Sequence, residues 1–316
     1  MAVAAPRVLV LRALGLGDLL TAVPALRALL DAFPGSRIQV ALPRSLAPLL
    51  GLVDGRLAAV EAGPLEPLPP TAHGADIGVN LHGRGPESHR VLLGAGPARV
   101  VAFRNRRIPQ IGGPRWRVGE HEVERWCRLL SESGVPADPG RLAIRPPLAG
   151  PHDSAAGATL IHPGAAARAR RWPAGRWAEV ARRERAAGRR VVVTGSAAER
   201  TLALAVARAA GLGADAVLAG RTDAVGLAAT VAGAARVACA DTGVAHLATA
   251  LGRPSVVLFG PTPPDEWGPP RERARHRVLW MGRRGDPHAQ APDPGLLAIT
   301  PDAVADELEA LSDSRA

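Results

Sequence analysis

The chain has 316 residues, 47% of them hydrophobic, which is enough material for two domains of roughly 150 residues each. All 39 basic residues are arginine, and 29 acidic residues leave a formal net charge of +10, which predicts anionic partners. Only 3% of the residues are aromatic, so stacking platforms for single-stranded nucleic acid are scarce and we expect no nucleic-acid partner. The two cysteines, Cys127 and Cys239, are too few for a disulfide scaffold and indicate a reducing compartment.

The first half of the chain alternates between short apolar runs and helical patterns. Residues 7–11 form a continuous apolar run that ends in a glycine turn, which is typical of a strand buried on both faces. Apolar positions then recur at helical spacing from 19 to 30. Further strands are predicted at 37–42, 76–81 and 99–103. This order predicts an α/β domain, Rossmann-like and doubly wound.

A proline-rich stretch at 144–151 predicts a linker, so we place the domains at 1–150 and 151–316. The alternation then restarts with strands predicted at 158–162, 190–194, 216–218, 236–240 and 255–259. Helices are predicted at 173–187, 197–210, 223–232 and 243–251, and a last one at about 301–311 is a candidate to pack back on the first domain. Two such domains in series predict a ligand cleft beyond the carboxyl ends of their strands.

No apolar run is long enough to cross a bilayer, because the run at 8–11 is short and the one at 247–259 is broken by Gly252 and Pro254. We therefore expect a cytoplasmic protein without a transmembrane segment. Peripheral membrane contact and the oligomeric state stay open.

The first turn that could carry chemistry is Gly15-Leu16-Gly17-Asp18, directly after the first predicted strand. A dinucleotide fingerprint does not fit, because Leu20 stands where its third glycine belongs and no acid ends the second strand. The turn does supply a carboxylate, Asp18. Asp18 is either a catalytic residue, or its carboxylate only interacts favourably with the positive end of the helix dipole.

Two loops in the second half combine a strand end, a helix start and polar side chains. Residues 162–173 join a glycine-alanine loop to an arginine cluster, which suits an anion such as a phosphate, although a solvated loop is the alternative. Residues 240–254 place Asp241, Thr242 and Gly243 before a helix, with His246 in its first turn. Capping alone explains Asp241 and Thr242 but not His246.

These motifs together resemble glycosyltransferase family nine, the ADP-heptose:lipopolysaccharide heptosyltransferases. The resemblance rests on the Asp-Thr-Gly-x-x-His core at 241–246 and the Leu-Phe-Gly-Pro-Thr-Pro run at 258–263. Gly17-Asp18, Leu81-His82-Gly83, His162-Pro163-Gly164 and Arg171-Trp172-Pro173 match in order and spacing.

The resemblance implies the GT-B architecture, in which two Rossmann-like domains face each other across a cleft. The first would hold mainly the acceptor and the second the nucleotide sugar. It also implies an inverting, metal-independent glycosyltransferase without a cofactor, which moves a heptose or related sugar from a nucleotide diphosphosugar, ADP-heptose in the first place. The chain agrees in having neither an Asp-x-Asp pair nor a His/Cys cluster with metal-ligand spacing, so we expect no metal site.

Site residues follow from the resemblance position by position. Asp18 matches the general base, Arg170 stands where many members carry a diphosphate-binding Lys, and Asp241 matches the carboxylate that touches the donor sugar. The remaining donor-binding candidates are Thr242, Gly243, Val244, His246, Gly164 and Ala165. The acceptor-binding candidates are Gly17, His82, Arg84, Arg104, Arg106 and Arg107. A solvated basic loop is the alternative for the last three of these.

Four positions depart from the family pattern. Gly226 stands where many members carry a Glu that binds the nucleotide ribose, which leaves the base open. Ala165 and Ala166 replace hydroxylated residues of the phosphate loop, and Asn80 replaces an Asp. The alternative to an enzyme is therefore a nucleotide-sugar-binding protein of the same fold without turnover. The acceptor would be a hydroxyl of a glycan, an envelope component or a secondary metabolite.

Overall fold

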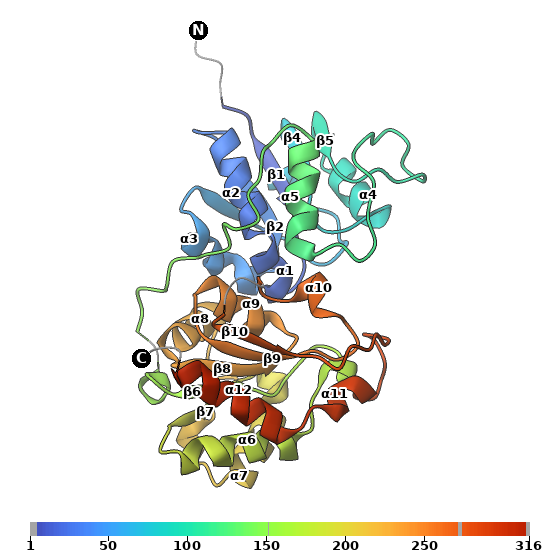
Figure 1. Ribbon diagram of the computed structural model, residues 1–316. Coiled ribbons are helices and arrows are strands. Elements are labelled where there is room, and N and C mark those ends of the chain that lie inside the picture. The colour runs from blue at the N-terminus through green and yellow to red at the C-terminus, as the bar shows by residue number, and fades with distance from the viewer. Residues whose placement is uncertain (1–4, 151, 271–273, 314–316) are drawn as a thin grey trace. The chain divides into compact units, whose positions relative to one another are not determined.

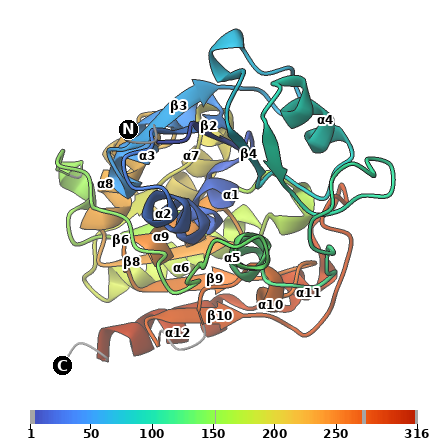
Figure 2. The same cartoon turned by 90° about the horizontal axis from the view of Figure 1, so that it is seen from above.

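The computed structural model describes residues 5–150, 152–270 and 274–313. The chain forms two compact units, Met1–Arg145 and Pro146–Ala316, so the division falls within the predicted linker and slightly before residue 150. Each unit consists of one five-stranded, fully parallel sheet with helices packed on it (Figure 1, Figure 2). Both units thus have the predicted α/β class.

The sheet of the first unit has the strand order β3-β2-β1-β4-β5, which is the Rossmann order. Its strands are β1 (Val8–Leu11), β2 (Ile38–Leu42), β3 (Leu57–Glu61), β4 (Ile77–Asn80) and β5 (Arg99–Val101). The central strand β1 is completely buried, as its continuous apolar run predicts. The edge strand β3 was not predicted, because only Leu57 and Val60 of its five residues are buried and the pattern has no clear period.

The helices of the first unit are α1 (Leu16–Thr21), α2 (Val23–Ala32), α3 (Leu50–Val53), α4 (Glu87–Gly94) and α5 (Glu122–Glu132). The helix predicted at 19–30 is two helices that meet at Ala22. Pro24 lies in the first turn of α2 and has no N–H to donate back into α1, so one continuous helix cannot form. The helices α2 and α5 lie side by side (Figure 1).

The sheet of the second unit has the strand order β10-β9-β8-β6-β7. Its strands are β6 (Thr159–His162), β7 (Val191–Val193), β8 (Arg236–Ala240), β9 (Ser255–Leu258) and β10 (His276–Leu279). The strand predicted at 216–218 is wrong, because residues Ala214–Ala216 form a 3₁₀ turn and only Val217 pairs with Val193, in a single parallel bridge. Counting that bridge as the third strand gives the six-stranded Rossmann order.

The helices of the second unit are α6 (Ala174–Ala186), α7 (Arg200–Ala209), α8 (Ala224–Gly233), α9 (Gly243–Ala250), α10 (Pro264–Trp267), α11 (Pro294–Ala298) and α12 (Pro301–Asp313). The last helix, α12, lies beside α6 and over β8 and β9 (Figure 1). Its apolar residues Val304, Leu308 and Leu311 belong to the core of this second unit. The expectation that it packs back on the first domain is therefore wrong.

Among the described residues the longest helices, α6 and α12, have 13 residues each, and no helix combines the length and apolar character that a bilayer crossing requires.

Candidate functional site

Parallel strands fix where functional side chains can gather, because all their carboxyl ends lie at one edge of the sheet. In the first unit this edge carries the loops after β1 and β4, with Asp18 and His82. In the second unit it carries the loops after β6 and β8, with Arg170 and Asp241. The winding of the second sheet reverses between β6 and β8, and ligands of such sheets bind at that switch point.

Asp18 lies in the first turn of α1, and its carboxylate makes two local contacts. Its Oδ2 accepts a hydrogen bond from the Gly15 amide at 3.1 Å, while Oδ1 lies 3.6 Å from the Arg12 guanidinium. The side chain nevertheless remains 28% exposed. Asp18 thus caps its helix, as the simpler interpretation predicts, and part of its carboxylate remains accessible to solvent.

Arg12 is the residue that the sequence analysis missed. It directly follows β1, is 1% exposed, and donates to the Asp18 carbonyl at 2.8 Å, to Thr21 Oγ1 at 3.0 Å and to the Leu81 carbonyl. Its guanidinium also donates to Glu122 Oε1 on α5 at 3.2 Å. Arg12 therefore ties the loop after β1 to the loop after β4. A lone arginine at the end of a continuous apolar run was the available signal.

Glu122 completes this buried charge cluster from α5. Its Oε1 also accepts from the indole N–H of Trp126 at 2.9 Å, and its Oε2 accepts from Arg125 at 3.0 Å. Each buried charge in the cluster thus meets a charge of opposite sign or a neutral donor. This satisfies the condition under which buried ionic groups are tolerated.

His82 is an uncharged ring beside this cluster. Its backbone amide donates to Asn80 Oδ1 at 2.9 Å, and its Nδ1 is buried without a hydrogen-bond partner in the described part of the chain. Burial and the nearby Arg12 lower the pKa of His82 to about 4, against a smaller opposing effect of Asp18. The predicted acceptor site therefore has a neutral imidazole here at physiological pH.

The arginines predicted to bind acceptor are exposed, and the structure ties their two loops together. The side-chain amide of Asn105 donates to the Arg84 carbonyl at 2.9 Å, and its oxygen accepts from the Arg107 amide at 2.9 Å. Arg84, Arg104, Arg106 and Arg107 are all exposed and form no side-chain ion pair within residues 5–150. This arrangement fits an anionic ligand and a solvated loop equally well. Gly17 is half-buried inside α1.

In the second unit, Arg170 and Asp241 meet across the switch point. One Arg170 Nη donates to the Asp241 backbone carbonyl at 3.1 Å and lies 3.4 Å from its carboxylate. Asp241 is 5% exposed and Arg170 26% exposed, while Arg170 Nε is buried with no partner among the described residues. The two loops that flank the switch point are thus joined by one guanidinium that keeps unused donors.

The start of α9 presents backbone N–H groups next to this contact. Thr242 is the residue before the helix, but its side chain makes no capping hydrogen bond, contrary to what its position suggests. Thr242 and Gly243 are half-buried and Val244 is buried. The ring of His246 packs edge-on against Trp267, with centroids 5.8 Å apart.

The loop after β6 brings Gly164 and Ala165 to the same edge of the sheet, although both are buried. The Ala165 carbonyl accepts from Arg171 Nε at 2.8 Å, and Ala165 itself is 1% exposed. A Cβ at Gly164 would meet the carboxylate of Glu199, so a larger residue there would require that side chain to move. Any donor contact from these two residues comes from their backbone.

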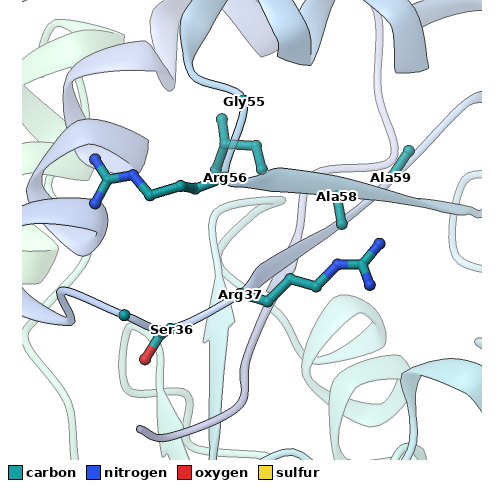
Figure 3. Close-up of a pocket in the computed structure, with 8 residues that line it drawn as sticks. Ser36, Arg37, Gly55, Arg56, Ala58 and Ala59 are labelled. Atoms are coloured by element: carbon teal, nitrogen blue, oxygen red, sulfur yellow. The ribbon is translucent and has the colours of Figure 1, made fainter.

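The pocket of the first unit does not coincide with the candidate site. A pocket of about 570 Å³ lies at the amino ends of β2 and β3, lined by residues that include Arg37 and Arg56. Figure 3 shows that these two guanidinium groups extend to opposite sides of it. It lies at the sheet edge away from Asp18. Within the described ranges, no three His, Cys, Asp or Glu side chains gather as a metal-binding group.

Comparison with known proteins identifies the family. Residues 106–292 match the model of glycosyltransferase family 9 (heptosyltransferase). This chain belongs to glycosyltransferase family 9. The matched region contains Arg170 and the 241–246 motif, whereas Asp18 and His82 lie outside it.

Individual relatives agree with this family membership. The chain is 35% identical over 150 residues to lipopolysaccharide heptosyltransferase 2 of Escherichia coli strain K12, over 45% of this chain and 43% of that protein. It is 38% identical over 155 residues to lipopolysaccharide heptosyltransferase 1 of Pseudomonas aeruginosa, over 48% of this chain and 42% of that protein. These matches span less than half the length of either relative.

The fold also matches a solved family structure. The structure of the ADP-heptose lipopolysaccharide heptosyltransferase II of E. coli superposes with a TM-score of 0.76, at 24% identity, over 98% of this chain and 100% of that one. The two parallel-sheet units are therefore those of the GT-B fold, as the resemblance implied.

The Arg12 cluster predicts a large stability effect. In Arg12→Met the buried Glu122 carboxylate and Asp18 lose their shared counter-charge, which should cost about 3–5 kcal/mol of unfolding free energy. Urea denaturation followed by circular dichroism measures this. Arg37→Met is the matched control, because Arg37 is exposed, and should change stability by less than about 0.5 kcal/mol. Equal stability of the two variants would contradict the account of the cluster.

The neutral His82 predicts a dependence of stability on pH. The pKa of His82 is lowered from 6.5 to about 4 in the folded chain, so below 6.5 the unfolded chain binds a proton that the folded chain does not. Stability should therefore fall as the pH drops from 6.5 toward 4, and less steeply in His82→Asn. Urea midpoints near pH 7 and near pH 5 test this, with the exposed His288→Asn as control. A wild-type slope in His82→Asn would exclude this effect.

Proposed function

We propose that this chain is an inverting, metal-independent glycosyltransferase. It moves a heptose or related sugar from a nucleotide diphosphosugar to a hydroxyl of a glycan, envelope or secondary-metabolite acceptor. The observation that carries the proposal is the Arg170–Asp241 contact across the switch point of the second sheet, in a chain of glycosyltransferase family 9. ADP-heptose is the first donor to test, because ADP-heptose is named for the E. coli structure of the same fold.

The second unit would bind the donor and stabilise its leaving group. Arg170 offers a charged, planar set of donors to the diphosphate, including the buried Nε without a partner in the described residues. The amides of Gly243 and Val244 at the start of α9 add donors and the positive end of the helix dipole. These groups would neutralise the charge that develops on the diphosphate without a metal ion. Asp241 would orient the sugar hydroxyls.

The first unit would bind the acceptor and remove its proton. Asp18 accepts the proton of the acceptor hydroxyl as its oxygen attacks the anomeric carbon, and the bond to the diphosphate breaks with its electron pair leaving on the nucleotide. A single displacement of this kind inverts the anomeric centre. Arg12 keeps Asp18 in place through the Asp18 carbonyl and carboxylate. The exposed Arg84, Arg104, Arg106 and Arg107 would favour an anionic acceptor.

The alternative is a nucleotide-sugar-binding protein without turnover. The engagement of Asp18 with both the Gly15 amide and Arg12 favours it, because both oxygens of the carboxylate already have a partner within the protein. In either case we place the protein in the cytoplasm, which agrees with two free, buried cysteines.

Two variants separate catalysis from donor binding. Asp18→Asn should lower the transfer rate by about 100-fold or more, because general base catalysis contributes about that factor, and should leave the donor Kd unchanged. Arg170→Ala should weaken donor binding by about tenfold, since it removes a charge-assisted contact. The measurements are ADP release from ADP-heptose with an envelope glycan extract, and calorimetric titration with ADP. Arg168→Ala in the same loop is the control, because Arg168 is exposed.

The same assay addresses the remaining parts of the proposal. Activity should persist in EDTA, and its loss would show that a metal is required. Unaltered turnover of Asp18→Asn would remove Asp18 from the role of base. ADP binding without transfer to any acceptor extract would favour the binding protein.

A further inference from the structure

The groups assigned to the donor site are all polar. Arg170, Asp241 and the amides at the start of α9 bind phosphates and hydroxyls. A sugar ring also presents C–H groups, whose slight positive charge favours the negative face of an aromatic ring. Only 3% of the residues are aromatic, so few side chains of this chain can supply such a surface.

The strand order gives the direction in which the sugar would lie. In the order β10-β9-β8-β6-β7, the switch point separates β6 and β7 from β8 and β9. Dinucleotide-binding domains hold the diphosphate at the switch point, and the two ends of the ligand extend to opposite sides of it. With the nucleoside of the donor over β6 and β7, its sugar would lie over β8 and β9. The loops at the carboxyl ends of these two strands are therefore the ones that can contact it.

Trp267 belongs to the segment that follows β9. It is the last residue of the one-turn helix α10, which comes after the Gly-Pro-Thr-Pro run at 260–263. Its ring packs edge-on against His246, with centroids 5.8 Å apart and an interplanar angle of 69°. His246 follows Gly243 by three positions on α9, so the two residues share one face of that helix. Trp267 is thereby attached to the helix start that is proposed to bind the diphosphate.

Further contacts hold the backbone of α10 in place. The amide of Gly268 donates to the Pro264 carbonyl at 2.6 Å and ends the helix directly after Trp267. Glu266, the preceding residue, forms an ion pair with Arg284 in the loop after β10. Trp267 thus projects from a backbone that is fixed on both sides, so its contact with a ligand requires little additional ordering.

The indole of Trp267 is half-buried, and its N–H makes no hydrogen bond to any described residue. By contrast, the indole N–H groups of Trp126, Trp172 and Trp280 all donate to protein oxygens. Trp267 therefore offers a ligand both an aromatic ring and a free donor. A sugar matches this pair, because its C–H groups pack on the ring and its hydroxyl oxygens accept hydrogen bonds.

We infer that Trp267 packs against the transferred sugar of the donor, next to Asp241, and that His246 holds the indole at the start of α9. The inference rests on the proposed donor site of the second unit. It makes Trp267 a specificity-determining residue that contacts the sugar and leaves the nucleotide untouched.

The test compares the Kd of ADP with that of ADP-heptose by calorimetry on the full chain, without acceptor. Trp267→Leu should weaken ADP-heptose binding about fivefold and leave the Kd of ADP unchanged, because the ring contacts only the sugar. Trp267→Phe keeps an aromatic face and should retain most of the affinity for ADP-heptose. Trp116→Leu removes another half-buried indole, from the first unit, and should bind both ligands like wild type.

Tryptophan fluorescence gives a second readout on the same proteins. ADP-heptose should change the emission of the wild-type chain more than ADP does, because only the sugar reaches the indole of Trp267. Trp267→Phe should lose this difference, and Trp116→Leu should keep it.

Three results would overturn the inference, and they differ from one another. Equal weakening of ADP and ADP-heptose by Trp267→Leu would show that the indole only supports the start of α9 through His246. Unchanged binding of both ligands would show that the indole lies outside the donor site. Failure of the wild-type chain to bind ADP would remove the donor site itself, and the wild-type titration alone would show this.

Discussion

The parallel direction of all strands within each sheet is the constraint on which the rest of this structure depends. It sends the loops after β1 and β4 of the first unit to one edge, and those after β6 and β8 of the second unit to another. Because the second sheet reverses its winding between β6 and β8, two loops from distant parts of the sequence flank one gap. Arg170 and Asp241, 71 positions apart, meet there. The glycines and helix starts that follow these strands supply the backbone donors.

The positive charge of the chain has two different roles at these edges. Arg12 is buried and structural, since its donors are used on Asp18, Thr21, Leu81 and Glu122. Arg170 is partly exposed and retains a buried donor without a partner among the described residues, so it remains able to bind an anion. The contacts and exposure of an individual arginine therefore indicate whether it can bind an anionic partner better than the total number of arginines does. His82 adds no positive charge, because its pKa is lowered to about 4.

Much of the fold could be predicted from the sequence wherever the signal is local. The apolar run of β1 and the motif before α9 predicted their elements, because complete burial and helix starts leave traces in neighbouring residues. The edge strands β3 and β10 were not predicted, since half-exposed strands have mixed patterns. The packing of α12 on its own unit depends on which core its apolar face meets, and a single helix pattern does not encode that.

The site was predictable where motifs carry it and not where distant contacts do. Arg170, Asp241 and the 242–246 segment were predicted as site residues from their motifs, and the structure brings them to one edge of the sheet. Arg12 was missed because its partner Glu122 lies 110 positions away. The spacing of residues along the chain does not indicate this contact.

The central claim, a nucleotide site at the β6–β8 switch point, is tested most directly by hydrogen–deuterium exchange with and without ADP. The account predicts slower amide exchange at residues 163–171 and 241–246 when ADP is present. It predicts no change around Arg37 and Arg56, at the amino ends of β2 and β3. Protection confined to that second region, or none at 163–171 and 241–246 at saturating ADP, would contradict it.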